Sequence, residues 1–329
     1  MRILYRTLIG LCLMALQTLG IASQVITQSA WLEDPTGKWT LEEVQGRTFQ
    51  PYTGLLSQGY SAKALWIRLD IEAQGNPTGQ PGHQLPLVLR VRPPYLDDIR
   101  LYDPLAPAVQ LAGDQHPKNV QDFKSLNHNF FVQAGDAPRT LWLRVETTSA
   151  RMVFLELLTL NQALEADHWL EWMFTGYLAL LLFFIIWATA HWFTLREPVI
   201  GMFAISQVAA LATGIGIFGF TALVWPDWLP QAGPSYLLSA SIIFSFITHI
   251  GFHWQLLRLF RPNKILLRTL LLMLGLGVLA FLVLLSGLER SALQANALLL
   301  IIAPLLTFLT ALTARIPGAW PKTCRLRST

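Results

Sequence analysis

Charged residues are scarce in this sequence: Asp, Glu, Lys and Arg make up 13% of its 329 residues, against roughly 25% in a soluble globular domain. Hydrophobic residues make up 53%, and the mean hydropathy is +0.43. This composition excludes a purely soluble protein. The formal net charge of +4 is too small a bias for a nucleic-acid-binding protein, so we expect no nucleic acid among its partners.

Cysteine is also nearly absent, because Cys12 and Cys324 are the only two and lie near opposite ends of the chain. No two thiols share a plausible folded unit, which excludes a disulfide framework and a cysteine-based zinc site. The first half of the chain also lacks the G-x-S-x-G signature of hydrolases. We therefore expect no enzymatic activity and no cofactor.

The charges that are present divide the chain in two. Residues 24–167 carry 12 basic and 16 acidic residues, whereas residues 168–329 carry 10 basic and 4 acidic residues. The first half has the composition of a domain in water, and the second half that of a domain in lipid. We predict a signal peptide (1–23), an exported domain (24–166), a membrane domain of about five helices (167–314) and a short basic cytoplasmic tail (315–329).

The amino terminus has the order of a secretory signal peptide. Arg2 and Arg6 precede an apolar run over residues 8–16, and the small residues Ala22 and Ser23 follow. We predict cleavage near residue 22 or 23. An uncleaved anchor helix is the alternative, since the apolar stretch almost reaches the length of a membrane span. In both cases the residues after about 23 are exported.

Several segments of the exported half alternate between apolar and polar residues. The alternation runs over residues 64–73, 85–91, 99–101 and 141–145, with Gly, Pro and Asn clusters between them. A period of two is typical of a half-buried strand. Short strands separated by turn residues predict an all-β, antiparallel sandwich with jelly-roll character.

A short sequence pattern occurs twice in these strands. Residues 65–70 read LWIRLD and residues 141–146 read LWLRVE, so Trp66 and Arg68 correspond to Trp142 and Arg144. An exposed aromatic ring beside a guanidinium group could stack on a sugar or hold an anion, which makes these four residues the candidate ligand-binding site. The alternative is that they pack against each other or beneath a further layer.

Histidines of the exported half show no metal-ligand spacing. His83, His116 and His128 are scattered through turn-rich segments, and we predict solvated loop histidines rather than a metal site.

The second half contains five apolar runs long enough to cross a membrane, at residues 169–193, 199–224, 236–257, 269–288 and 293–314. With residues 24–166 outside the cell membrane, nine of the ten basic residues after residue 167 fall in the cytoplasmic loops and tail, as the positive-inside rule requires. Aromatic residues expected at the outer interface are Trp169, Trp172, Trp225, Trp228 and Tyr236.

Two polar features lie within these runs. His249 and His253, four residues apart, form a candidate pair of ligands for a metal or haem. Neutral histidines bonded to helix carbonyls are the alternative, since no further ligand is visible. Gly214, Gly216 and Gly219 predict close helix packing.

Both halves, in this order, resemble the bacterial seven-transmembrane receptors with diverse intracellular signalling modules. In the exported half the resemblance, to the type-2 extracellular domain of this family, rests on residues 64–69, 94–102, 113–114 and 140–146. In the membrane half it rests on residues 176–181, 195–198, 216–220 and 225–226. The resemblance implies a periplasmic sensor domain similar to a carbohydrate-binding module, in a multi-pass protein of the bacterial inner membrane with a cytoplasmic carboxyl terminus.

Members of this family have seven spans and a cytoplasmic output module. This sequence shows five spans, so we expect a receptor truncated after five spans, without its own output domain. The resemblance implies a small-molecule or carbohydrate ligand, contact with membrane lipid, and signalling through a separate output protein or a homo-oligomer. One alternative is a transporter or channel subunit, which is disfavoured because no acidic residue lies deep in any span. The other is a membrane-anchored binding or scaffold module without signalling.

Overall fold

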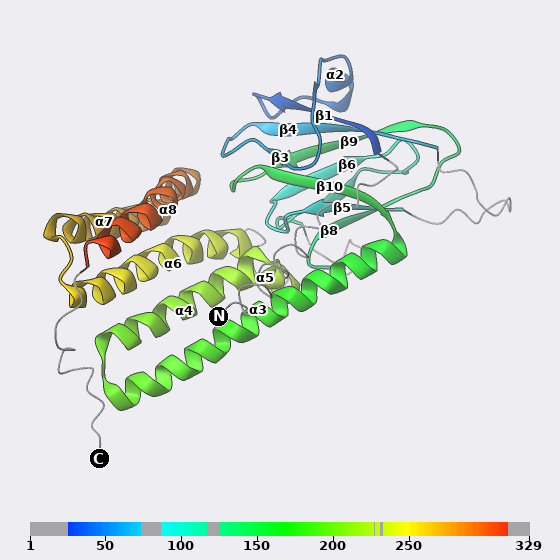
Figure 1. The fold of residues 1–329 in the computed structure, drawn as a ribbon. Helices are drawn as coiled ribbons and strands as arrows, with labels where there is room; N and C mark the ends of the chain where they lie inside the picture. The colour runs from blue at the N-terminus through cyan, green and yellow to red at the C-terminus, as the bar shows by residue number, and fades with distance from the viewer. Residues whose placement is uncertain (1–25, 74–86, 117–124, 227, 231–232, 315–329) are drawn as a thin grey trace.

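The computed structural model describes residues 26–73, 87–116, 125–226, 228–230 and 233–314. A β-sandwich lies at one end of a group of long helices (Figure 1). The predicted signal peptide (1–23), the predicted tail (315–329), both cysteines and His83 lie outside the described residues.

The sandwich consists of two sheets whose neighbouring strands are all antiparallel. The six-stranded sheet contains, in spatial order, β2 (Gln50–Pro51), β1 (Ile26–Asp34), β4 (Ala64–Ile71), β9 (Arg139–Glu146), β6 (Asp98–Tyr102) and β7 (Gln110–Ala112). The four-stranded sheet contains β3 (Leu56–Ser57), β10 (Met152–Thr159), β5 (Leu87–Arg92) and β8 (His128–Val132). The predicted antiparallel sandwich is confirmed.

The alternating sequence of each strand places its apolar side chains between the sheets. In β4, Leu65, Ile67 and Leu69 are fully buried in the main core. They face Val145, Leu143 and Leu141 of β9 across the ladder. A shift of register by one residue would turn Trp66 and Arg68 into this core, so the burial of the apolar face fixes the register.

Five helices of the described chain are long and apolar enough to cross a membrane: α3 (Leu160–Leu195), α4 (Pro198–Ile217), α6 (Gly233–Leu257), α7 (Lys264–Leu285) and α8 (Glu289–Leu312). The 3-10 turn η2 (Arg258–Phe260) follows α6 directly. Helices α3, α4 and α6 lie side by side, and α7 and α8 pack next to α6 (Figure 1). The predicted helical membrane domain is confirmed.

Helix α3 follows strand β10 without a linker. Thr159, the last residue of β10, is the N-cap: its hydroxyl accepts from the amide of Gln162, whose side chain accepts from the amide of Thr159. Such a capping box satisfies two backbone donors at the start of a helix. The helix therefore begins at Leu160, within the segment assigned from the sequence to the exported domain.

The second predicted span is interrupted. Helix α4 ends at Ile217, and a short helix, α5 (Phe220–Val224), follows after a break. Gly219 at the break has a φ of +83°, a backbone conformation that favours glycine. A Cβ at this position would lie 2.7 Å from the carbonyl oxygen of Leu126 and 2.8 Å from Cβ of Pro94. The break thus lets the chain pass close beneath the sandwich.

The other two predicted packing glycines lie between helices. A Cβ on Gly214 would lie 2.9 Å from a methyl group of Leu178 on α3, and a Cβ on Gly216 would lie 2.9 Å from a methyl group of Leu238 on α6. Side chains at these positions would force the neighbouring helices apart. The predicted close packing is confirmed.

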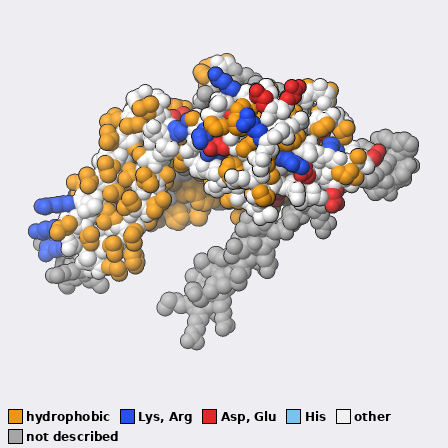
Figure 2. Space-filling view, turned by 90° about the horizontal axis from the view of Figure 1, so that it is seen from above, with side chains coloured by type: hydrophobic (Ala, Val, Ile, Leu, Met, Phe, Trp, Pro, Cys, Tyr) orange, Lys and Arg blue, Asp and Glu red, His pale blue; other side chains and the backbone are white. Residues whose placement is uncertain are grey.

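The surfaces of the two parts differ in chemistry. Figure 2 shows hydrophobic side chains over the visible face of the helices and Lys and Arg side chains at the end away from the sandwich. The basic residues at the ends and connections on that side are Arg196, Arg258, Arg261, Lys264 and Arg268. An apolar belt with cations at one end is typical of membrane helices.

We expect Leu143→Ala to lower the free energy of unfolding of the sandwich by about 2–5 kcal/mol, because the variant leaves a cavity in the core. Leu143 is fully buried in the main core. Leu111→Ala, at a side chain that is 39% exposed, is the control. Urea-dependent hydrogen exchange of the β9 amides in the full-length chain measures the loss of stability in both variants. Equal exchange in the two variants would contradict the strand register.

Candidate functional site

The two predicted tryptophans lie beneath a short helix, α2 (Leu41–Gln45), on the outer face of the six-stranded sheet. Trp66 is 0% exposed and stacks on Tyr102 with ring centroids 5.6 Å apart. Trp142 is 8% exposed and meets the ring of Phe49 edge-on at 5.4 Å. With Val44 of α2 they form a second, smaller hydrophobic core. Both tryptophans are therefore packed beneath a further layer, which is the alternative to a binding role that the sequence left open.

The turn that leads into α2 is fixed by the carboxylate of Asp34. Its oxygens accept hydrogen bonds from the amides of Thr36, Gly37 and Trp39, each at 2.9 Å. Burial alone would raise the pKa of Asp34, but these hydrogen bonds hold it below its ordinary value. Arg144 adds a hydrogen bond of 2.6 Å from its guanidinium to the carbonyl oxygen of Gly37.

The four predicted site residues are neighbours across one strand pair. Trp66 lies opposite Arg144, and Arg68 lies opposite Trp142. Arg144 has a side chain that is 9% exposed and pairs with Glu146. The Arg68 side chain is 43% exposed and pairs with Asp70 at 2.8 Å. The two pairs share one face of the sheet. Of these four residues, only Arg68 lines a groove at the side of the sandwich. Ligand binding by these residues stays a prediction.

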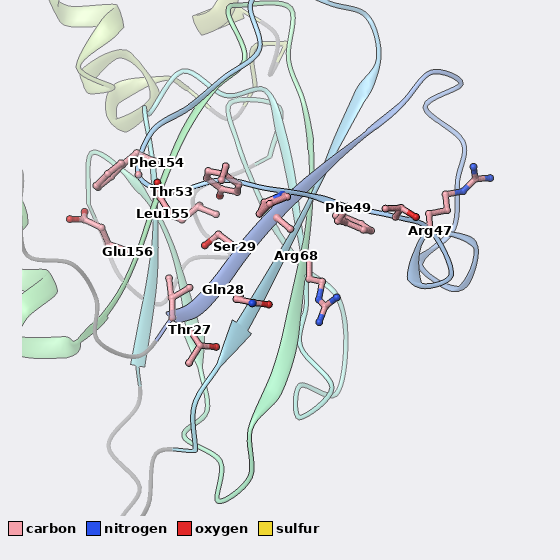
Figure 3. Close-up of a pocket in the computed structure, with 16 residues that line it drawn as sticks. Thr27, Gln28, Ser29, Arg47, Phe49, Thr53, Arg68, Phe154, Leu155 and Glu156 are labelled. Atoms are coloured by element: carbon pink, nitrogen blue, oxygen red, sulfur yellow. The ribbon is translucent and has the colours of Figure 1, made fainter.

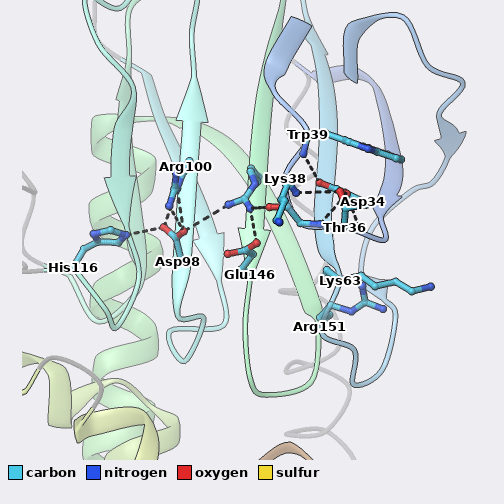
Figure 4. A network of polar contacts seen from close by, with 12 residues as sticks. Asp34, Thr36, Lys38, Trp39, Lys63, Asp98, Arg100, His116, Glu146 and Arg151 are labelled. Carbon is cyan, nitrogen blue, oxygen red and sulfur yellow. Dashed lines mark hydrogen bonds and ion pairs between the residues drawn. The ribbon is translucent and has the colours of Figure 1, made fainter. Parts of the chain in front are cut away.

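A polar network continues across the same face (Figure 4). The carboxylate of Asp98 lies 2.7 Å from Nε2 of His116, 2.9 Å from the guanidinium of Arg100 and 3.8 Å from that of Arg144. The ring of His116 is thus hydrogen-bonded to Asp98 rather than freely solvated.

The prediction of a solvated loop position for His128 is wrong. His128 is fully buried on β8, and its Nε2 lies 3.0 Å from the carbonyl oxygen of Pro94. The strand was not recognised because its sequence, HNFFV, does not alternate between apolar and polar residues.

A groove that sequence reasoning missed opens along one side of the sandwich. It has a volume of about 800 Å³, within the range of small-molecule sites. Strand β1 runs through it, Arg47 and Phe49 lie on one side, and Phe154 and Glu156 of β10 lie on the other (Figure 3). Because β2 and β3 have only two residues each, they leave much of this side of the two sheets uncovered.

One wall of the groove carries the carboxylate of Glu156, whose charge is neutralised by two arginines. The Glu156 carboxylate lies 3.0 Å from Nη1 of Arg90 and 3.1 Å from Nη2 of Arg92. Its side chain is 14% exposed. Arg90, which is 1% exposed, needs such partners, because an unpaired buried charge strongly destabilises a fold.

Arg90 also reaches the first membrane helix. Its Nη2 forms an ion pair of 2.5 Å with Oδ1 of Asp167, two turns into α3. The hydroxyl of Ser125 and the side-chain Nδ2 groups of Asn127 and Asn129 donate to the same carboxylate, at 2.5, 2.9 and 3.3 Å. The chain of contacts from Glu156 through Arg90 to Asp167 therefore links the groove wall to α3.

A second buried carboxylate joins the sandwich to α6. Asp97 accepts hydrogen bonds from the amide and hydroxyl of Thr148, at 2.7 and 2.9 Å, and from the hydroxyl of Ser235 at 3.2 Å. Burial raises the pKa of Asp97, and these hydrogen bonds oppose the shift. Nearby, Arg290 of α8 donates to the carbonyl oxygen of Thr147 at 3.3 Å. The sandwich thus contacts three of the long helices through polar groups.

His249 and His253 each bond within their own helix. Nδ1 of His249 lies 2.8 Å from the carbonyl oxygen of Ser245, and Nδ1 of His253 lies 2.8 Å from that of His249. Each carbonyl can only accept, so both rings donate from Nδ1. The described residues contain no group of three or more His, Cys, Asp or Glu side chains that could hold a metal ion.

A β-sandwich fixed to long apolar helices, with a groove on its side, defines a receptor-like membrane protein. Residues 27–159, which include nearly all of the sandwich, match the family 7TMR-DISM extracellular 2. The five helices that follow fit the membrane domain of a seven-transmembrane receptor. A comparison with curated proteins found no match to the chain.

We expect Trp66→Ala to lower the free energy of unfolding by about 3–5 kcal/mol, since it removes a fully buried ring. Arg68→Ala, in the next outward-facing position of β4, should change it by less than about 1 kcal/mol, because its ion pair is exposed. Chemical denaturation of the full-length chain in detergent gives both values. A stable Trp66→Ala protein would refute the second core.

Asp167→Ala should destabilise the contact between sandwich and α3 by about 3–5 kcal/mol, because Arg90 then keeps only Glu156 as an acidic partner in a buried position. Glu165→Ala, which removes an exposed carboxylate from the same helix, is the matched control and should be nearly neutral. The measurement is the hydrogen-exchange protection of the first two turns of α3. Equal protection in the two variants would show that Asp167 does not hold the helix.

Proposed function

We propose that this protein is a sensory receptor of the bacterial inner membrane. Its sandwich lies in the periplasm and binds a small-molecule or carbohydrate-like ligand, and its helices carry the resulting change across the membrane. Residues 1–23 serve as the signal peptide, and the carboxyl terminus is cytoplasmic. The basic residues at the helix ends away from the sandwich support this orientation.

The observation that carries the proposal is the fixed junction between the two parts. Strand β10 lines the groove at Phe154–Glu156 and continues directly into α3. A ligand that moved β10 would therefore also move the first membrane helix. The ion pairs from Glu156 to Arg90 and from Arg90 to Asp167 give a second connection between the same two places.

These contacts favour signalling over a passive anchor. A scaffold that only tethers a binding domain requires neither a rigid connection nor buried ion pairs at the junction. For a transporter or channel subunit we find no comparable support in the described helices. The signal would pass from the inner helix ends to a separate output protein, a second copy of the chain or an output module.

Hydrogen exchange of the full-length chain in lipid nanodiscs tests the coupling. We expect Glu156→Gln, a change in the groove wall, to alter exchange in the first turns of α3 about fivefold, the effect of about 1 kcal/mol. Glu72→Gln, an exposed position after β4, is the control and should leave α3 unchanged. If Glu156→Gln alters only the sandwich, the two parts are uncoupled and the scaffold alternative is favoured.

A further inference from the structure

The side groove carries more positive than negative charge on its described residues. Arg47 and Arg68 line it, and Glu156 is the only acidic residue among its lining residues. Glu156 is already paired with Arg90 and Arg92. Arg68 pairs with Asp70, and none of the ion pairs among the described residues includes Arg47. The lining thus favours an anionic ligand over a cationic one.

The position of Arg47 suits it to bind an anion. Its guanidinium carbon lies 3.5 Å from the centroid of the Trp39 ring, and the side chain is exposed. Stacking on the ring orients the planar group and leaves its N–H edge available. A carboxylate can accept two parallel hydrogen bonds from such an edge. The ring therefore holds the guanidinium ready for a planar anion.

The remaining lining combines hydrogen-bonding groups with aromatic rings. The polar side chains are Thr27, Gln28, Ser29, Thr48 and Thr53, and the aromatic side chains are Phe49, Tyr52 and Phe154. A sugar ring has an apolar C–H face and a rim of hydroxyl groups. The aromatic rings of the groove can cover the C–H face of a sugar, and its hydroxyl and amide side chains can form hydrogen bonds with the sugar hydroxyl groups.

We propose that the side groove, through which β1 runs, binds an acidic saccharide, with Arg47 and Arg68 as the residues that recognise its carboxylates. This inference rests on the proposed receptor function and specifies its ligand class. Arg68 is one of the four residues that the sequence predicts as a ligand-binding site. Arg47 lies in the segment after α2, where no repeated motif marks it. The two guanidinium groups come from separate segments, one on β4 and one after α2. They therefore favour a ligand that carries two or more carboxylates on different rings.

The test measures binding to the full-length chain in nanodiscs of zwitterionic lipid by isothermal titration calorimetry. The probes are trigalacturonate and its methyl ester, which has the same rings without the charges. We expect the ester to bind at least about tenfold more weakly. Arg47→Gln and Arg68→Gln should each weaken trigalacturonate binding about fivefold or more and leave binding of the ester unchanged.

Arg100→Gln is the matched control. Like Arg68, Arg100 pairs with an aspartate two residues away, and its side chain is 42% exposed, against 43% for Arg68. It lies on β6, outside the groove, and its loss should not change binding. Thermal unfolding of all three variants checks that they fold equally well.

Three results would overturn the inference. They are equal affinity for acid and ester, an Arg100→Gln effect as large as that of Arg68→Gln, and no binding of trigalacturonate at millimolar concentration. Equal affinity would leave a saccharide receptor without charge selection. Absence of saccharide binding, with hydrogen exchange still coupled between Glu156 and α3, would overturn the ligand class and leave the receptor function standing.

Discussion

The ion pair between Arg90 and Asp167 determines how the two parts of this protein fit together. Arg90 is 1% exposed and Asp167 is 5% exposed, so each would strongly destabilise the fold if it were left alone. Arg90 belongs to β5 of the sandwich, and Asp167 belongs to α3. Arg90 also pairs with Glu156 inside the sandwich, but Asp167 meets its cationic partner only when the helix stands against the sandwich. Hydrogen bonds from Ser125, Asn127 and Asn129 of the sandwich also stabilise the Asp167 carboxylate, and they too form only in this arrangement.

The sandwich uses its two outer surfaces differently. The outer face of the six-stranded sheet carries a second core under α2, where Trp66 and Trp142 are buried. The open side next to β1 carries the groove. Arg68 and Arg47 lie where these surfaces meet, since Arg68 is on the covered sheet and Arg47 follows the covering helix. The packing beneath α2 therefore also positions the cationic side of the groove.

Much of the fold could be predicted from the sequence, and little of the groove. Strict alternation identified β4, β5, β6 and β9, and hydropathy identified the long helices. Strand β8 lacks alternation, and β10 (MVFLELLT) has consecutive apolar residues on both faces because α3 packs close by. The sequence shows the Trp and Arg pairs, but the choice between binding and packing depends on α2. Leu41 and Val44 are the only apolar residues of this five-residue helix, too few to establish a hydrophobic period. The groove depends on how far β2 and β3 extend, which no local pattern encodes.

The unbroken passage from β10 into α3 also has a mechanical meaning. Helix α3 has 36 residues, about 54 Å at 1.5 Å per residue, whereas the hydrocarbon layer is about 30 Å thick. Its first turns therefore stand above the lipid as a stiff stalk, and Trp169 and Trp172 mark the level at which it enters the interface. A rigid helix of this length would turn about that level as a lever does. A tilt of about 5° would displace one end of the helix relative to the other by about 5 Å.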